Sequence, residues 1–530
     1  MKIFFIVNDL GINEPFGPMI LSAILKKNGH EVTLGVLQKE NVEEKILLWR
    51  PDVLAYSMMS VDMVQMMEFN KKLREKVKIF TILGGSHPTL DQNCMSHGGI
   101  DAICIGEGDN ALLKLVNRLE NNEAKDNIPN IKTSSDSKVI QDQLICDLDS
   151  LPFMDRELVY SYPEMARFGI KGIWTSRGCA FPCPYCFNNR YNALHRSKGK
   201  IVRRRSVDSI IEETKLLKKK YRTSFIRIQD DVFIYKVDDW LKEFADKWST
   251  EIKLPFYCLL RSELITDEMA YLLKKAGCFS ICMSIESGND DIRNKMMRRK
   301  VSKEQLETAF KILKKYKLNV YANSMYALPF TKLSHDIASL DFVIKVQPDM
   351  PNFSIFMPYP GTDLGDYSYD QGIYDPEKNN ISHGMRNMSS LACFTDGQKK
   401  AQYNLCELSI IAVKFPILRN LIVNHLIYWP PNKIFFLIHY FFTLYAYGKK
   451  IFYFKHTIIE YVELFSRTFK HYLYDFTKGE QKIESKSVPI EKFVLSEEER
   501  NRKLNDCMET MAKHYVYTTS QNRLKKTLEK

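Results

Sequence analysis

Three cysteines lie close together in the segment from Ser176 to Asn188, which reads SRGCAFPCPYCFN and spaces them as C-x3-C-x2-C. Thiolates are the usual ligands of iron–sulfur clusters, and short spacings allow one loop to wrap a cluster. Three ligands leave one iron of a four-iron cubane open, and an open coordination position marks a reactive metal rather than a structural one. The pattern therefore predicts a reactive [4Fe–4S] cluster held by Cys179, Cys183 and Cys186.

Two alternatives to an iron–sulfur cluster stay open at these cysteines. Zinc would need a fourth protein ligand, and His195 is the nearest residue that could supply one. The second alternative is that three unrelated thiols share one loop. The absence of a further His or Cys at close range favours the iron–sulfur cluster over zinc.

Strand-like and helix-like segments alternate on both sides of this loop. Near the N-terminus, the apolar run KIFFIV precedes a segment of helical spacing at 17–28, which Gly29 follows as a C-cap. Such alternation predicts a parallel, doubly wound sheet, which binds ligands at the carboxyl ends of its strands. From Lys171 onward the alternation resumes. We expect six strands there, near 172–178, 225–233, 256–262, 279–287, 320–328 and 351–359. Six strand–helix units predict a barrel or partial barrel with catalytic groups at the strand ends.

The cysteine loop resembles the signature of the radical S-adenosylmethionine (radical SAM) enzymes, C-x3-C-x-aromatic-C, with Tyr185 as the aromatic residue. The resemblance implies that the open iron chelates SAM. One electron from the cluster then cleaves SAM to methionine and a 5′-deoxyadenosyl radical, which abstracts a hydrogen atom from the substrate. The cofactors would carry this chemistry, and the protein would position them.

Further segments resemble the SAM-contacting motifs of that family, over about residues 170–370. The resemblance implies SAM contacts from Tyr185, Asp230, Arg261, Ser284 and Glu286, and it extends to Ala327–Pro329 and Pro358–Thr362. Ser284 and Ala327 replace glycines of the family pattern. The alternatives are that Asp230 caps the next helix and that Arg261 pairs with Glu263. No residue is assigned as the catalytic group.

The N-terminal loops resemble those of the cobalamin-binding subfamily. The matching segments are Pro15–Pro18, Ser57–Ser60, Gly84–Pro88 and Gly106–Gly108. The resemblance implies cobalamin contacts from Gly17, Pro18, Ser57, Gly84, Gly85, His87, Gly106, Glu107 and Gly108. Asp109 follows where the family often has Glu. Glycines at strand ends allow the backbone to approach a large planar ligand.

The D-x-H-x-x-G motif, which supplies a histidine to cobalt, is absent from the sequence. His87 is therefore not assumed to be the cobalt ligand, and a loop histidine bonded to backbone is the alternative. A domain that kept this fold and lost cobalamin is a further alternative. The tRNA methylthiotransferase group is disfavoured, because its N-terminal domain carries three further cysteines, whereas this one has only Cys94 and Cys104, with Cys146 after it.

The expected fold class is therefore α/β: a doubly wound, Rossmann-like cobalamin-binding domain, a partial (β/α)6 TIM-type radical SAM barrel, and a mainly helical C-terminal region. The boundaries we expect are 1–140 for the first domain, 141–168 for a linker, 169–378 for the barrel and 379–530 for the helical region.

The amino-acid composition bears on the cellular compartment of the protein and on the classes of partner that it could bind. The chain has 530 residues, 12 cysteines and a net charge of +12. Disulfide frameworks belong to short secreted chains, and the apolar run at the N-terminus is too short for a signal peptide. We therefore expect a cytoplasmic protein. The basic excess alone does not choose between nucleic acid, an anionic membrane and anionic small molecules, and we expect no nucleic-acid partner.

Residues 411–475 are aromatic and basic, with a local charge of +5. Their longest uncharged run, Ile434–Gly448, has 15 residues, whereas a membrane-spanning helix needs about 20. Aromatic and basic residues on apolar helices suit a membrane interface, and an ordinary helical cap is the alternative. We therefore consider contact with the inner face of a membrane.

The sequence as a whole predicts a cobalamin-dependent radical SAM enzyme that methylates a carbon of a small-molecule or lipid-like substrate. Its cofactors would be a [4Fe–4S] cluster, SAM and cobalamin, and an electron donor such as flavodoxin or ferredoxin would be its redox partner. The alternatives are a cobalamin-dependent cyclisation or rearrangement, and an iron–sulfur scaffold protein without turnover.

Overall fold

The computed structural model describes residues 1–11, 14–96, 98–136, 138–375, 387–452 and 495–513. These residues form two compact units. Unit 1 contains Met1–Phe168, Ser176–Ala180 and Phe187–Thr223, and unit 2 contains Gly169–Thr175, Phe181–Cys186 and the chain from Ser224 onward. Each unit is treated by itself. The boundaries expected at 140, 168 and 378 stay predictions.

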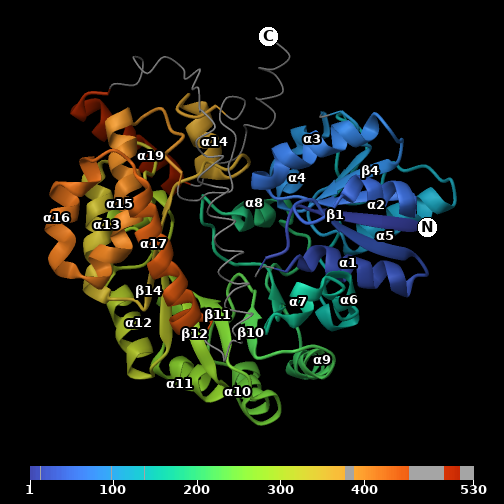
Figure 1. The fold of residues 1–530 in the computed structure, drawn as a ribbon, viewed down its shortest axis with the longest axis horizontal. Coiled ribbons are helices and arrows are strands. Elements are labelled where there is room, and N and C mark those ends of the chain that lie inside the picture. The colour runs from blue at the N-terminus through green and yellow to red at the C-terminus, as the bar shows by residue number, and fades with distance from the viewer. Residues whose placement is uncertain (12–13, 97, 137, 376–386, 453–494, 514–530) are drawn as a thin grey trace. The chain divides into compact units, whose positions relative to one another are not determined.

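Unit 1 is built on a sheet in the order β2-β1-β3-β4-β5-β6. Its strands are β1 (Lys2–Val7), β2 (Glu31–Val36), β3 (Val53–Ser57), β4 (Phe80–Gly84), β5 (Ala102–Cys104) and β6 (Ile131–Lys132). The first five pair in parallel, and β6 is antiparallel to β5. The helices between them are α1 (Phe16–Lys27), α2 (Val42–Trp49), α3 (Met63–Arg74), α4 (Ser86–Leu90) and α5 (Asp109–Glu120) (Figure 1). This is the doubly wound order 2-1-3-4-5, which confirms the predicted fold.

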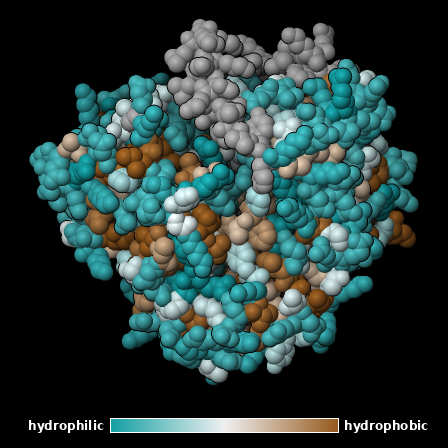
Figure 2. Space-filling model, turned by 180° about the vertical axis from the view of Figure 1, so that it is seen from behind, coloured by the Kyte–Doolittle hydropathy of each residue, from teal (hydrophilic) through white to brown (hydrophobic). Residues whose placement is uncertain are grey.

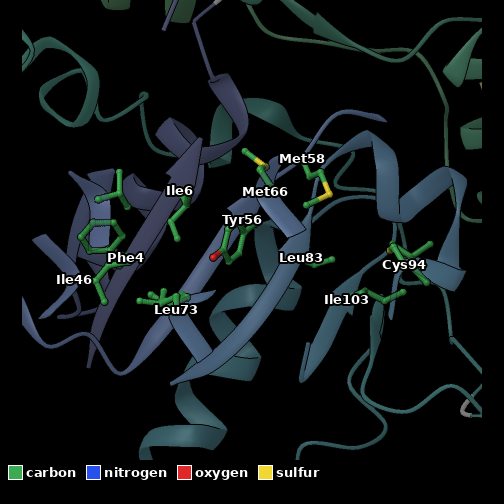
Figure 3. Close-up of a cluster of buried hydrophobic side chains, with 13 residues drawn as sticks. Phe4, Ile6, Ile46, Tyr56, Met58, Met66, Leu73, Leu83, Cys94 and Ile103 are labelled. Atoms are coloured by element: carbon green, nitrogen blue, oxygen red, sulfur yellow. The ribbon is translucent and has the colours of Figure 1, made fainter. Parts of the chain in front are cut away.

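The core of unit 1 explains why its strands form. Alternate residues of a strand point to the same face of the sheet, so Phe4 and Ile6 of β1 lie together with Tyr56 of β3. Figure 3 shows these side chains in one buried cluster with Ile46 of α2 and Leu73 of α3. Strand β1 is buried from its second residue to its last, as expected for a strand covered on both faces.

Further segments of unit 1 follow the first sheet. Two short helices, α6 (Arg156–Tyr160) and α7 (Pro163–Arg167), lie in the stretch 141–168 that we expected to be a linker. Later segments of the same unit are β8 (Ser176–Arg177), α8 (Phe187–Leu194), β9 (Arg203–Arg204) and α9 (Val207–Lys220). Strands β8 and β9 form a separate antiparallel pair, with Ser176 opposite Arg204 and Arg177 opposite Arg203.

Unit 2 contains six parallel strands in the order β14-β13-β12-β11-β10-β7. They are β7 (Ile170–Ile173), β10 (Phe225–Ile228), β11 (Phe256–Leu260), β12 (Cys278–Glu286), β13 (Asn319–Tyr326) and β14 (Met350–Ile355). Helices alternate with them along the chain: α10 (Asp239–Lys247), α11 (Asp267–Ala276), α12 (Lys303–Lys315) and α13 (Leu333–Val346) (Figure 1). Strands β7 and β14 lie at opposite ends of this order, so the partial (β/α)6 barrel is confirmed.

One predicted strand was wrong in its extent. We expected a strand across 172–178, but β7 ends at Ile173. The backbone leaves the sheet there because the N–H of Thr175 donates to the Asp230 carboxylate over 2.7 Å. Ser176 and Arg177 then pair with β9 instead.

The barrel strands are followed by helices, and the described part of the expected C-terminal region is mainly helical, as predicted. They are α14 (Asp363–Asp370), α15 (Asp396–Lys414), α16 (Arg419–Asn424), α17 (Lys433–Ala446) and α19 (Glu497–Ala512). The predicted interfacial segment 411–475 lies within the described residues only as far as Phe452. Within the part of the chain that the structure describes, no helix has the length and apolar character needed to cross a membrane.

Candidate active site

The cysteine loop is divided between the two units. Cys179 belongs to unit 1, whereas Cys183 and Cys186 belong to unit 2. Cys179 and Cys183 are buried and Cys186 is half-buried, and none of the three is in a disulfide bond. No set of three or more His, Cys, Asp or Glu side chains is arranged as a metal site among the described residues. The cluster ligands therefore stay a prediction from the cysteine spacing.

In unit 1, three sets of contacts fix the chain around Cys179. Asn192 of α8 donates to the carbonyl of Cys179 over 2.8 Å. Gly178 has a φ of +87°, and a Cβ there would lie 2.2 Å from the carbonyl oxygen of Ile201. Arg177 pairs with β9 and binds the Asp109 carboxylate through two hydrogen bonds of 2.8 and 2.9 Å. This end of the loop is fixed before any metal binds.

In unit 2, charged and aromatic side chains surround Cys183. Arg261, which follows β11, donates to Cys183 Sγ over 3.4 Å. Its guanidinium carbon lies 3.7 Å from the centre of the Phe181 ring. The same guanidinium pairs with Glu263 at 2.5 Å and donates to the carbonyl of Arg299 over 3.0 Å. The sulfur of Cys183 is thus held in a fixed position among polar partners, and sulfur is the donor that iron–sulfur clusters use. The donor chemistry at Cys183 thus fits an iron–sulfur cluster.

Glu286 ends β12 in a strained conformation. Its φ is +65°, a region that non-glycine residues rarely adopt, and the register with β13 shifts between Ser284 and Glu286. Bulges re-aim side chains beside active sites, and strained residues concentrate there. The Glu286 carboxylate accepts from the Tyr185 hydroxyl over 2.9 Å and lies 3.6 Å from Arg299. Burial and this carboxylate raise the pKa of the Tyr185 phenol.

The remaining predicted SAM contacts lie at the ends of neighbouring strands. Asp230, after β10, accepts from both the N–H and the hydroxyl of Thr175. Ser284 accepts from Arg299 through its carbonyl over 3.1 Å. Arg299 was not singled out from the sequence, because it follows an irregular helical turn and belongs to no motif that we identified. Of the two alternatives considered for Arg261 and Asp230, the structure contains the Arg261–Glu263 pair.

A buried carboxylate supports the turn after β13. Ala327 has a φ of +56°, and its N–H donates to Asp336 of α13 over 3.2 Å. Gln402 of α15 donates to the second oxygen of Asp336 over 3.1 Å, while the amide oxygen of Gln402 is buried without a hydrogen-bond partner. Burial raises the pKa of Asp336 to about 7, although these two hydrogen bonds oppose the shift.

This raised pKa gives a testable pH dependence. Asp336 ionises near pH 3.8 in the unfolded chain and near 7 in the folded one, so the folded state binds more protons in between. Stability from this group therefore falls as pH rises from about 4 to about 7. Asp336→Asn should remove the penalty, because a flipped Gln402 amide can accept from the new amide. We expect a gain of between about 1 and 4 kcal/mol at pH 8.

The measurement is the unfolding midpoint of the apoprotein and of the Asp336→Asn variant at several pH values from 4.5 to 8. The difference between the two should grow with pH. A difference that stays constant over this range would contradict the assignment. Asp341→Asn is the control, because Asp341 lies on the same helix in an exposed ion pair with Arg419.

The predicted cobalamin residues lie at the carboxyl edge of the sheet of unit 1. Ser57 ends β3 and Gly84 ends β4, while Gly17 and Pro18 lie in the first turn of α1. The loops are joined by hydrogen bonds from Met58 N–H to the Gly84 carbonyl and from Gly106 N–H to the Thr89 hydroxyl, of 2.9 and 3.1 Å. At Gly85, φ is +102° and a Cβ would lie 2.7 Å from the Met58 carbonyl oxygen. The close packing of these loops requires glycine there.

Two side chains in these loops already have protein partners. Nδ1 of the buried His87 lies 3.1 Å from the Ser60 hydroxyl. Glu107 accepts from Arg203 at 2.8 and 3.0 Å. Burial opposes ionisation of Glu107, but the Arg203 hydrogen bonds and the charge of Arg177 outweigh it and hold the pKa of this carboxyl below its usual range. These loops lie at the edge where doubly wound sheets bind ligands, whereas the Glu107 side chain is bound to Arg203.

Comparisons with known proteins match both units. Residues 174–342 match the family model of the radical SAM superfamily, and residues 4–116 match that of the B12 binding domain. A relative in Pyrococcus horikoshii, named as an uncharacterized methyltransferase, is 25% identical over 375 residues, which are 67% of this chain and 78% of that protein. A hopanoid C-3 methylase of Methylococcus capsulatus is 24% identical over 366 residues, 66% of this chain and 68% of its own.

Among solved structures, the cobalamin-dependent S-adenosylmethionine radical enzyme OxsB with aqua-cobalamin bound has a TM-score of 0.60 at 14% identity. The match covers 96% of this chain and 84% of that one, and it supports the fold. The chain therefore contains a radical SAM domain at residues 174–342 and a B12-binding domain at residues 4–116. It is a radical SAM enzyme, and its cofactors are a [4Fe–4S] cluster, SAM and cobalamin, as these two domains imply.

Proposed function

We propose that this enzyme transfers a methyl group from SAM to a carbon atom of a small-molecule or lipid-like substrate, with cobalamin as the methyl carrier. The observation that carries the proposal is the presence of a B12-binding domain and a radical SAM domain in one chain. The two relatives named as a methyltransferase and a methylase support it. When bound, the cluster and SAM supply the radical that activates the substrate, and cobalamin supplies the methyl group.

The residues of the cysteine loop take defined roles in this proposal. Cys179, Cys183 and Cys186 hold the cluster, and Arg261 positions Cys183 by donating to its Sγ over 3.4 Å. Tyr185 orients Glu286 through a hydrogen bond of 2.9 Å, so that the carboxylate can accept from the ammonium group of SAM. Ser284 and Asp230 complete the proposed SAM contacts from the neighbouring strand ends.

The cobalamin contacts are assigned to the loops at the carboxyl edge of the first sheet. Their proposed members are Gly17, Pro18, Ser57, Gly84, Gly85, His87, Gly106 and Gly108, together with the backbone of Glu107, whose side chain binds Arg203. The glycine backbones provide a close approach to the corrin ring. His87 is held by Ser60 and is not assigned to cobalt. The bound corrinoid should therefore lack a histidine supplied by a D-x-H-x-x-G motif.

The test uses the full chain, reconstituted anaerobically with iron, sulfide and hydroxocobalamin, and reduced flavodoxin or ferredoxin as electron donor. We expect a bound corrinoid with a base-off spectrum and formation of both 5′-deoxyadenosine and S-adenosylhomocysteine from SAM. Formation of 5′-deoxyadenosine without S-adenosylhomocysteine would refute methylation and favour cyclisation or rearrangement. A protein that holds the cluster and ignores the corrinoid would refute the cobalamin role.

We also propose that the C-terminal helices contact an anionic membrane surface at its inner face. Figure 2 shows one face of the protein, on which hydrophobic residues form small patches among mainly hydrophilic ones, and the residues of the C-terminal patch are given by their exposed fractions. The stretch from Phe415 to Tyr445 contributes many exposed large hydrophobic side chains, namely Phe415, Ile417, Leu421, Tyr428, Trp429, Ile434, Leu437, Phe441 and Tyr445. Lys414 and Lys449 are exposed beside them. Further aromatics of α17, such as Phe435 and Tyr440, are buried, so the helix serves partly as a cap.

This proposal predicts salt-sensitive binding to liposomes. Each basic residue near an anionic surface contributes about 1 kcal/mol before screening. Cosedimentation should be higher with anionic than with neutral lipid and should fall at high salt. Ile417→Asp, at a side chain 89% exposed, should weaken binding, whereas Leu48→Asp, at one 77% exposed on α2, should not. Full recovery in the supernatant with every lipid would end the proposal, and so would release only by detergent.

A further inference from the structure

We propose that Glu107 and Asp109 are positioning residues for the cluster loop. Their carboxylates hold the chain segment that leads into Cys179, while the backbone of the same loop remains available to cobalamin. This inference rests on the proposed function, because it takes Cys179 as a cluster ligand. It assigns a role to Asp109, which the loop resemblance named without a role, and moves the Glu107 side chain from cobalamin contact to loop support.

The two carboxylates and two arginines form one continuous network within unit 1. Asp109 binds both terminal nitrogens of Arg177, at 2.8 and 2.9 Å. Glu107 binds both terminal nitrogens of Arg203, at 3.0 and 2.8 Å, and also lies 3.4 Å from Arg177. Two-point pairing of this kind fixes orientation as well as distance, because the guanidinium fork is rigid and planar.

The network binds both strands of the β8–β9 pair, and β8 leads directly into the cluster loop. Arg177 and Arg203 are opposite each other in the β8–β9 pair. The two carboxylates therefore bind one side chain from each strand of the pair. Arg177 lies two residues before Cys179, with only Gly178 between them. The direction in which the chain enters the cysteine loop is therefore set by where the carboxylates hold Arg177.

Because the network is buried, each of its charged side chains depends on its partner for compensation of the charge. The side chain of Arg203 is 1% exposed and that of Asp109 is 5% exposed. A buried arginine that loses its carboxylate keeps its charge and must find another partner or water. Replacing Asp109 by Asn removes the charge and one of the two acceptors. The expected response is movement of Arg177, and with it of the backbone that precedes Cys179.

A second buried Arg–carboxylate network in the same unit provides a matched control. Glu213 pairs with Arg156 at 2.9 Å and with Arg205 at 2.5 Å, and all three side chains are buried. These residues lie on α6, on α9 and in the turn before α9, and none is adjacent to a cysteine of the loop. Glu213→Gln should lower the stability of unit 1 as Asp109→Asn does, without acting on the chain at Cys179.

The experiment compares the full-length wild type with Asp109→Asn, Glu107→Gln, Asp109→Glu and Glu213→Gln after anaerobic reconstitution. Three quantities are measured: the rate at which a chelator removes iron, the EPR spectrum of the reduced cluster without SAM, and the affinity for hydroxocobalamin from a spectral titration. We expect Asp109→Asn and Glu107→Gln to release iron at least about tenfold faster, with a shifted EPR spectrum and corrinoid affinity within about twofold of wild type. Asp109→Glu should restore the wild-type spectrum, because it keeps the carboxylate.

Each result that differs from the expected one leads to a different conclusion. Wild-type iron release and EPR spectra in both amide variants would overturn the inference. Loss of corrinoid affinity with an unchanged cluster would return the Glu107 side chain to cobalamin contact. Equal acceleration of iron release in Glu213→Gln would reduce the effect to general destabilisation. If Asp109→Asn does not fold, Arg177→Lys, which keeps the charge and loses the fork, must show the same cluster defect. A wild type that takes up no cluster would instead refute the proposed function.

Discussion

The variant in which Cys179, Cys183 and Cys186 are all replaced by Ala is expected to retain no iron–sulfur absorbance and to form no 5′-deoxyadenosine from SAM. The reason is chemical, since the loop offers no further thiolate or imidazole at comparable spacing and the cluster must be held by thiolates. Arg261 would lose the sulfur it contacts and keep its bonds to Glu263 and Arg299. The fold should persist, because these interactions stay in place. The measurement is iron per chain, with circular dichroism as the check on folding.

The matched control is the triple replacement of Cys94, Cys104 and Cys146 by Ala. These are the cysteines that a second cluster of the methylthiotransferase type would need. Cys94 and Cys104 are buried, and burial raises the pKa of both thiols, which disfavours the metal-binding thiolate. Iron content and SAM cleavage should therefore match the wild type. Unchanged iron in the first triple variant, or loss of about half the iron in the control, would contradict the single-cluster assignment.

The sheets could be predicted from the sequence because their signal is local. A strand buried on both faces needs a continuous apolar run, and KIFFIV at β1 is such a run. The position of the cysteine loop after the first barrel strand was also predictable, since β7 and the loop are adjacent along the chain. Strand ends were less predictable. The end of β7 depends on the hydrogen bond from Thr175 to Asp230, which lies 55 residues further along the chain. The periodicity of the sequence does not predict such a hydrogen bond.

The supports of the candidate site could not be predicted, because they depend on contacts between distant segments. Arg177 was part of the recognised loop, yet its partner Asp109 is 68 residues away. Arg299 reaches Glu286 and Ser284 from an irregular turn. Asp336 supports Ala327 from α13. In each case the residue type is ordinary for an exposed surface, and only the folded chain shows that it is buried beside a functional loop.

Gly178 offers the most sensitive single position in the cysteine loop, and Gly178→Ala is expected to abolish stable cluster binding. Its φ of +87° is unfavourable for any side chain, and the new Cβ would lie 2.2 Å from the Ile201 carbonyl oxygen. Such strain costs about 1–3 kcal/mol, and the overlap with backbone adds roughly 1–3 kcal/mol more. The backbone can relieve both only by moving residues 176–180 away from β9. That movement would displace Cys179, which Asn192 holds through its carbonyl.

Gly397→Ala is the matched control, because it introduces the same methyl group on α15, where no atom lies within 4 Å of the new Cβ. Gly397 is the second residue of α15, so the substitution should gain at most about 0.5–1 kcal/mol. The measurement is iron per chain after reconstitution and gel filtration, together with the unfolding midpoint of each apoprotein. Gly178→Ala should lose most of its iron and unfold more readily, while Gly397→Ala should keep a full cluster. If Gly178→Ala retains the cluster and the wild-type midpoint, the close approach of Gly178 to Ile201 does not shape the loop, and the anchoring of Cys179 to unit 1 must be abandoned.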